Sequence, residues 1–220
     1  MLGIYVSVPV ACFRKGLARE YLETEAIPPP ATCYGFLLSL VGETDRRRHI
    51  GCRVTPVLLG HPPTSVVLRT VWRIKKTPLG SSGNTRPDYQ QLLTGVELVI
   101  WLDSHGEELT TGPTLETRVT SALSQPATVT RFGGLSLGES THLVDEVTPV
   151  ARIIEREPDR LKYPARAFLL RERGRLTLPI WVDHVGSAKT RFATGDLVDW
   201  PPQQPPEVDS LPRILPEYAS

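Results

Sequence analysis

The chain has 220 residues, enough for one domain with a substantial core or for two small domains. Its 21 prolines argue against a helical bundle, and its three separated cysteines argue against a disulfide framework or a zinc knuckle. The formal net charge of +1 gives no bulk attraction to nucleic acid, and without a signal-peptide pattern or a membrane-spanning run we expect a cytoplasmic protein with reduced thiols.

The N-terminal segment predicts a strand followed by a basic loop. Apolar side chains recur at alternate positions over residues 2–12, as a strand with one buried face requires. Pro9 has the opposite parity and predicts a sheet edge or the end of regular pairing. The next stretch, "FRKGLAREY", places three cations around a glycine: Arg14, Lys15 and Arg19.

A helix is predicted next, over residues 31–42. Three prolines lead into it, and the sequence "ATCYGFLLSLVG" spaces its apolar residues so that they share one helical face. Gly42 is placed to cap the C-terminus of the helix. Gly35 inside the helix costs about 1 kcal/mol relative to alanine, so we expect it to serve close contact with another backbone.

Residues 65–103 predict two strands joined by a projecting segment. In "SVVLRTVWRIKK" one parity is apolar and the other carries a row of cations, which predicts one apolar face and one basic face. The polar stretch 77–90, rich in glycine, serine and proline, separates this strand from the nearly continuous apolar strand 95–103, which we expect to be buried. The pattern predicts an extended hairpin, or thumb, inserted at about residues 73–95.

The middle of the chain predicts a second helix and a glycine-rich turn. Residues 112–126 have a helical apolar stripe with Thr114 as the N-cap. Residues 131–140, "RFGGLSLGES", predict a turn into a strand at 143–154.

The C-terminal third predicts a hairpin and a tail. Residues 165–182 have the pattern of two strands that turn at Gly174, with a basic tip. Residues 201–220 form a proline-rich tail, either an extended strap or a disordered segment. Strands outnumber helices, so we expect an α+β fold, ferredoxin-like in outline, with a single domain over residues 1–200.

Several kinds of catalytic site are disfavoured by spacing. The five histidines lie far apart without metal-ligand spacing, so we expect no metal site and no cofactor. Ser140 and His142 are close in sequence, but the nucleophile pattern G-x-S-x-G is absent. The glycine-rich turn lacks the G-K-[ST] ending of a phosphate-binding loop.

Cations interleaved with glycines and aromatic residues favour RNA as a ligand. Phosphates require cations and open backbone N–H groups, and unstacked bases require flat side chains. The candidate RNA-binding residues are Arg14, Lys15, Arg19, Arg69, Arg73, Lys75, Lys76, Arg86, Tyr89, Arg131, Gly133, Gly134, Gly138 and Ser140. Arg46, Arg47 and Arg48 follow the predicted helix end, where cations favour the helix dipole, and we give them a structural role.

Three stretches carry a family resemblance. They are "VACFRKGLAREYLETEAIPPPATCYGFLLSLVGE", "TRPDYQQLLTGVELVIWL" and "RFGGLSLGESTHLVDEV". In these stretches the chain resembles the Cas-five family of CRISPR-associated proteins, within the repeat-associated (RAMP) superfamily. The resemblance is closest to members of type I systems of the I-B or myxobacterial-like kind, and beyond residue 150 it is loose.

The resemblance implies a modified ferredoxin-like, RRM-related fold with a projecting thumb hairpin, extended at the C-terminus by the predicted β-hairpin. It also implies a subunit of the Cascade complex that grips the five-prime handle of the guide RNA. Its partners would be the Cas-seven backbone subunit and the Cas-eight large subunit, with target DNA reached only through the complex. Gly35 would then admit either tight helix packing or RNA close to the helix.

Two alternatives remain open. Some relatives cut the repeat RNA without a metal, using histidine, tyrosine and lysine, and His142 and Tyr21 are candidates here. No full catalytic set can be aligned, so we expect binding without turnover. The second alternative is a protein-interaction scaffold that makes no contact with RNA.

Overall fold

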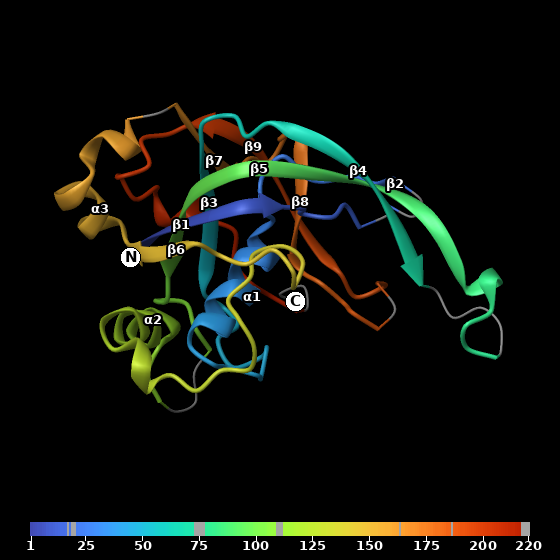
Figure 1. The fold of residues 1–220 in the computed structure, drawn as a ribbon. Coiled ribbons are helices and arrows are strands. Elements are labelled where there is room, and N and C mark those ends of the chain that lie inside the picture. Colours follow the sequence, from blue (N-terminus) through green and yellow to red (C-terminus); the bar gives the residue numbers. More distant parts are fainter. Residues whose placement is uncertain are drawn as a thin grey trace.

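A computed structural model gives the architecture drawn in Figure 1. The structure describes residues 1–220 except 17, 19–20, 73–77, 109–111, 163, 186 and 217–220. Four predicted RNA-binding cations, Arg19, Arg73, Lys75 and Lys76, therefore lie outside the described residues.

A large antiparallel sheet dominates the fold. Its strands are β1 (Leu2–Ala11), β2 (Tyr21–Leu22), β3 (Arg53–Leu59), β4 (Thr64–Trp72), β5 (Thr85–Asp103), β6 (Glu146–Pro149), β7 (Ala165–Leu170), β8 (Leu176–Trp181) and β9 (Arg191–Asp199). The helices are α1 (Pro30–Leu40), α2 (Leu115–Ser124) and α3 (Val150–Arg156). In the described part of the chain the strand order is β6-β1-β5-β3-β7-β9-β8, with β2 and β4 attached to β5. The expected mixture of helices and a large sheet is thus confirmed.

The strand β1 lies inside the sheet, paired with β5 on one edge and β6 on the other, and a hydrophobic core covers each of its faces. Ile4 and Val6 belong to the core on the α1 side of the sheet, as their alternation predicts. Tyr5 has the opposite parity and is also fully buried, in a second core on the other face. Pro9 lies beyond the last residue that pairs with β6, so its missing N–H removes no bond to that strand.

The predicted first helix is confirmed as α1. Pro29 is its N-cap and Pro30 its first helical residue, where a missing N–H has no intrahelical partner. The predicted apolar face is buried and consists of Cys33, Phe36, Leu37, Leu40 and Val41. Gly42 has φ +67° and its N–H donates to the carbonyl of Ser39, so this glycine closes the helix as predicted.

Helices cover both faces of the sheet. Figure 1 shows α1 and α2 on the same side, and α2 begins at the predicted N-cap. The hydroxyl of Thr114 accepts a hydrogen bond from the Thr117 N–H at 3.2 Å. On the other face, α3 contributes Ile153 to the core that contains Tyr5.

The proline-rich C-terminal segment runs as an extended strap as far as residue 216, where its description ends. Leu211 and Ile214 are fully buried, one in each of the two cores. The Val54 N–H donates to the carbonyl of Pro212, and the Ile214 N–H donates to that of Cys52. The apolar residues between the prolines therefore belong to the folded core.

The predicted C-terminal hairpin over residues 165–182 is wrong. Strand β9 lies between β7 and β8 and pairs with both of them. Gly174 permits this close approach, since a Cβ atom there would lie 2.3 Å from the carbonyl oxygen of Gly195 in β9. The sequence pattern of two short apolar runs around a glycine is the same whether the two strands pair with each other or with a later strand between them. The pattern therefore could not show that β9 lies between β7 and β8.

The predicted strand over residues 143–154 is wrong in its second half. Only Glu146–Pro149 is a strand, and α3 begins directly after it. Pro149 explains the change, because proline lacks the N–H that a sheet ladder needs but is tolerated at a helix start.

Candidate nucleic-acid interface

A long hairpin leaves the sheet where β4 pairs with the first part of β5. Its register runs from Thr64 opposite Leu93 to Trp72 opposite Thr85. Figure 1 shows this hairpin curving away from the body of the molecule, with residues 78–84 near its far end. The hairpin is thus one continuous extension of the central strand β5.

The apolar face of this hairpin is exposed. Leu68 lies directly opposite Tyr89, and their exposed fractions are 63% and 54%. Trp72 is 60% exposed further along the same parity. Tyr21 of β2 extends the face, with its ring centroid 6.4 Å from that of Tyr89 and the rings tilted by 57°. The predicted apolar face is present, but no described element packs on it, because β4 lies outside the layered body.

The opposite face of the hairpin is polar and paired internally. Arg69 lies 3.1 Å from a carboxylate oxygen of Glu139 and also contacts the side-chain oxygen of Gln90. The Gln90 amide nitrogen donates to Glu139 at 2.9 Å. Arg86 pairs with the buried Asp88 at 2.7 Å. The predicted basic face is therefore partly neutralised, and Glu139 ties the hairpin to the glycine-rich turn.

The glycine-rich turn is built against the end of β1. Gly138 has φ +99°, and a Cβ atom there would lie 2.7 Å from the carbonyl oxygen of Cys12. A side chain at this position would therefore strain the backbone and clash with β1. Gly133 also has a positive φ, but space around it is open. Of these two glycines, only Gly138 is required by a close approach.

His142 anchors the turn. Its Nδ1 atom accepts hydrogen bonds from the N–H groups of Cys12, at 3.1 Å, and Glu139, at 3.3 Å. Burial lowers the pKa of His142, and nearby Arg69 acts in the same direction against the raising effect of Glu139. The imidazole ring is therefore held neutral. Its Nδ1 atom already accepts two backbone hydrogen bonds, so it is not available for proton transfer.

The basic loop after β1 lies beside the hairpin. Arg14 is exposed, and its guanidinium donates to the carbonyl of Ala18 at 3.0 Å. Lys15 lies 3.7 Å from Glu23, and both side chains are nearly half exposed. The Thr24 N–H donates to the side-chain oxygen of Gln91 at 3.0 Å, which links the loop to β5.

The structure thus brings together part of the predicted site. Glu139 in the turn contacts Arg69 on the hairpin. His142 and Gly138 in the same turn lie against Cys12, two residues before Arg14. Ser140 is exposed next to this junction. Tyr89 lies level with the junction but on the opposite face of the hairpin, and Arg86 lies further out along it. The start of the turn contains Arg131, Gly133 and Gly134. The Arg131 side chain lines a hollow over α1.

Sequence reasoning missed this hollow, which we call the α1 groove. Two adjoining hollows of about 640 and 310 Å³ share Gly35, Leu38, Ser39, Arg46 and His184. An added Cβ atom at Gly35 would meet no described atom within 4 Å. The close backbone contact expected at Gly35 is therefore absent from the described structure, and the glycine faces open space.

Cations and aromatic rings surround the α1 groove. The Arg46 guanidinium lies 4.4 Å from the ring centroid of Trp181 and donates to the carbonyl of Val182 at 2.8 Å. Arg46 therefore does more than favour the helix dipole. Trp181 is 135 positions away in the chain, so no local pattern signals this contact. Phe132, beside Arg131, is fully exposed.

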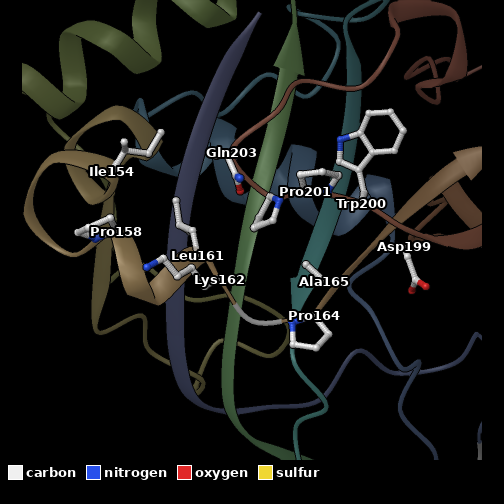
Figure 2. Close-up of a pocket in the computed structure, with 11 residues that line it drawn as sticks. Ile154, Pro158, Leu161, Lys162, Pro164, Ala165, Asp199, Trp200, Pro201 and Gln203 are labelled. Carbon is white, nitrogen blue, oxygen red and sulfur yellow. The ribbon is translucent and has the colours of Figure 1, made fainter.

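A larger hollow of about 720 Å³ lies elsewhere (Figure 2). Figure 2 shows Ile154, Pro158 and Leu161 on one side and Trp200 on the other. None of the predicted RNA-binding residues lines it. The Trp200 indole N–H already donates to the carbonyl of Gln204 at 2.8 Å, and the polar side chains in the lining are those of Lys162, Asp199 and Gln203.

Among the described residues, no three His, Cys, Asp or Glu side chains are placed to hold a metal ion. No helix among them is both long enough and apolar enough to cross a membrane.

Comparison with known proteins decides the family. No family model matches the chain. A CRISPR-associated protein Cas5 from Myxococcus xanthus (strain DK1622) is 53% identical over 216 residues, which cover 97% of each protein. The chain belongs to the Cas5 family. The resemblance found in the three N-terminal and central stretches is thereby confirmed, and it extends through the C-terminal third.

Solved structures support the Cas5 fold. A chain of a "CRISPR RNA-guided surveillance complex" superposes with a TM-score of 0.59 at 14% identity, covering 90% of this chain and 89% of that one. A "Crystal structure of Cas protein" superposes with a TM-score of 0.51 at 15% identity, covering 94% and 98%. At such low identity these likenesses concern the fold alone.

Proposed function

We propose that this Cas5 family member is an RNA-binding subunit of a CRISPR effector complex and holds the five-prime handle of the guide RNA. The observation that carries the proposal is the junction of the glycine-rich turn with the base of the hairpin. Glu139 joins Arg69 and Gln90 there, while His142 fixes the turn against β1. A preformed junction of this kind gives an RNA strand a fixed surface.

Phosphate contacts would come from the basic loop and the turn, and base contacts from the apolar face of the hairpin, opposite the face that carries Arg69. Arg14 and Lys15 are cations on the loop beside the hairpin, and the glycines of the turn leave backbone N–H groups open to a phosphate chain. Tyr21 and Tyr89 present exposed rings on the hairpin, which suit stacking on unpaired bases. The chemistry therefore favours single-stranded RNA over duplex.

The surrounding assembly is part of the same proposal. The hairpin would act as the thumb of a ferredoxin-like RAMP domain and contact a Cas-seven backbone subunit, with a Cas-eight large subunit docked nearby. The complex would be a cytoplasmic type I Cascade, of the I-B or myxobacterial-like kind, and would meet target DNA through its other members. Support comes from the Cas5 relative and from the surveillance-complex chain that shares the fold.

We propose binding without cleavage. The Nδ1 atom of His142 is occupied by two backbone donors, so this histidine serves the turn rather than a proton transfer at that atom. Incubation of the purified protein with repeat RNA in a chelator tests the ribonuclease alternative. Intact RNA is expected, and a discrete cut would contradict the proposal.

Charge reversal in the basic loop tests RNA binding itself. The Arg14→Glu, Lys15→Glu double variant should retain less guide RNA after co-purification with the neighbouring subunits. The Arg152→Glu, Arg156→Glu double variant on α3 is the matched control, because it reverses the same number of charges at exposed positions of a different element. Unchanged retention in the double variant would favour a protein scaffold without RNA contact.

A further inference from the structure

The α1 groove contains features that the packing of the protein does not explain. Gly35 lies on the exposed side of α1, where a side chain would meet no described atom. Helices are destabilised by an interior glycine, so an open glycine at this position needs another cause. A ligand that lies directly on the helix backbone supplies one.

The charges that line the groove favour an anion. Arg46 is held in place by Trp181 and Val182. The guanidinium of Arg131 makes no hydrogen bond within the described residues, and its Nη1 atom is removed from solvent. The lining carboxylate Glu43 already pairs with Arg118 and Arg48, the latter at 3.2 Å. Asp183, beside the groove, also acts on Arg46, and its carboxylate accepts hydrogen bonds from the N–H groups of Val185 and Lys189. The groove therefore presents two guanidinium groups, and Glu43, the carboxylate that lines it, is already paired.

An aromatic ring lies beside these cations. Phe132 lines the larger hollow and is fully exposed, although it is one of the most apolar side chains in the protein. A flat exposed ring next to cations matches the two parts of a nucleotide, a planar base and a phosphate. An acidic segment of a protein would use the cations but has no need of an open ring.

The groove is continuous with the junction proposed to bind RNA. Ser136 and Gly138 line its smaller hollow, and Gly138 also contacts the end of β1. The same turn thus forms a wall of the α1 groove on one side and meets Glu139 and Arg69 on the other. An RNA strand that follows the turn from the hairpin reaches the groove.

We propose that the α1 groove binds one nucleotide of the guide RNA, with its phosphate at Arg131 and Arg46 and its base against Phe132. This inference rests on the proposed function, since it assigns a subsite of the same RNA. Gly35 keeps the groove open for the nucleotide. The proposal therefore names a binding site on the exposed side of α1, with the end of β8 as part of its wall.

The test uses the full chain and a fluorescently labelled single-stranded RNA with the handle and guide sequences. Gly35→Leu should fill the groove and weaken RNA binding at least about fivefold in anisotropy titrations. Arg131→Gln should weaken binding to a similar degree and make its salt dependence shallower by about 0.7 in log–log slope, as loss of one phosphate contact predicts. Gly35→Ala and Arg175→Gln are the controls and should bind as the unaltered chain does.

Folding and location are checked separately. Thermal unfolding shows whether each variant is folded, and Arg131→Gln keeps the test valid if Gly35→Leu is not. RNA that carries 4-thiouridine should crosslink to residues 130–136 at one position of the handle. If the unaltered chain binds RNA but both variants bind equally well and no crosslink forms there, the groove assignment is overturned while the proposed function stands. If the unaltered chain binds no RNA, both are overturned.

Discussion

The Nδ1 atom of His142 lies 3.1 Å from the backbone nitrogen of Cys12, 130 residues earlier in the chain. This bond, with the one from the Glu139 N–H, holds the glycine-rich turn against the end of β1. Since both donors need an unprotonated acceptor, the position of the turn depends on a neutral histidine. The junction on which the proposed function depends is therefore sensitive to this side chain.

Replacing this side chain should loosen the turn. His142→Ala leaves the buried Cys12 N–H without its acceptor, so we expect a loss of about 1–3 kcal/mol in the free energy of unfolding. Chemical denaturation measures this loss. A change within about 0.5 kcal/mol, the usual range for surface substitutions, would show that the bond contributes little.

The same bond predicts a pH dependence. The pKa of His142 is lowered in the folded state, chiefly by burial, so the unfolded chain binds the extra proton more readily. Stability from this group is full above its unfolded pKa of about 6.5 and decreases as the pH falls through that value towards the folded pKa. Denaturation at pH 7.5 and 5.5 should show this decrease, and His142→Gln should reduce it.

A carboxylate provides an internal check on that pH window. Burial acts to raise the pKa of Glu43, but Arg118 and Arg48 outweigh it and lower the value to about 2. Its stabilisation is lost only as the pH falls from about 4.5 towards 2, below the window of His142. The two contributions therefore separate in a pH series.

Two glycines should respond to alanine in opposite directions. Gly138→Ala places a Cβ atom 2.7 Å from a backbone carbonyl at a φ of +99°, so it should destabilise the protein by about 1–3 kcal/mol. Gly35→Ala meets open space within a helix and should stabilise it by up to about 1 kcal/mol. Paired melting curves compare them. Destabilisation by Gly35→Ala would show that the helix packs against something on its open side.

The exposed ring of Tyr89 should matter for RNA and not for folding. Tyr89→Ala should leave stability within about 0.5 kcal/mol and weaken RNA binding roughly 5- to 100-fold, as expected for loss of one stacked base. Phe192→Ala is the matched control, because Phe192 is an aromatic residue of similar exposure on β9. Equal RNA affinity in both variants would argue that the hairpin face contacts protein instead.

Local signals predicted α1 and α2 well, whereas α3 was missed. The proline lead-in, the apolar spacing of α1 and the cap at Gly42 all act within a few residues, and so does the N-cap at Thr114. The pattern of two strands around a polar stretch also predicted an extended hairpin here, but β5 begins at Thr85, inside the stretch 77–90, rather than at residue 95. These features depend on neighbours in sequence, so one sequence is sufficient to predict them.

Features that depend on distant parts of the chain were missed. Alternation on β4 gave the correct parity, but it does not tell whether another layer covers Leu68. Strand β9 pairs between two earlier strands where Gly174 and Gly195 approach each other closely. No local sequence pattern predicts this approach. The contact of Arg46 with Trp181 likewise joins residues far apart in the chain and has no local sequence signal. The α1 groove arises from such contacts and could not be predicted from the sequence.

The central claim is that this chain binds single-stranded guide RNA through several phosphates at once. Its most direct test is the affinity of the purified chain for labelled handle RNA, titrated at several salt concentrations. The account predicts that log K falls linearly with log salt, with a slope of about −2 or steeper, which corresponds to three or more neutralised phosphates. Binding that is independent of salt, or no binding at the lowest salt concentration, would contradict it.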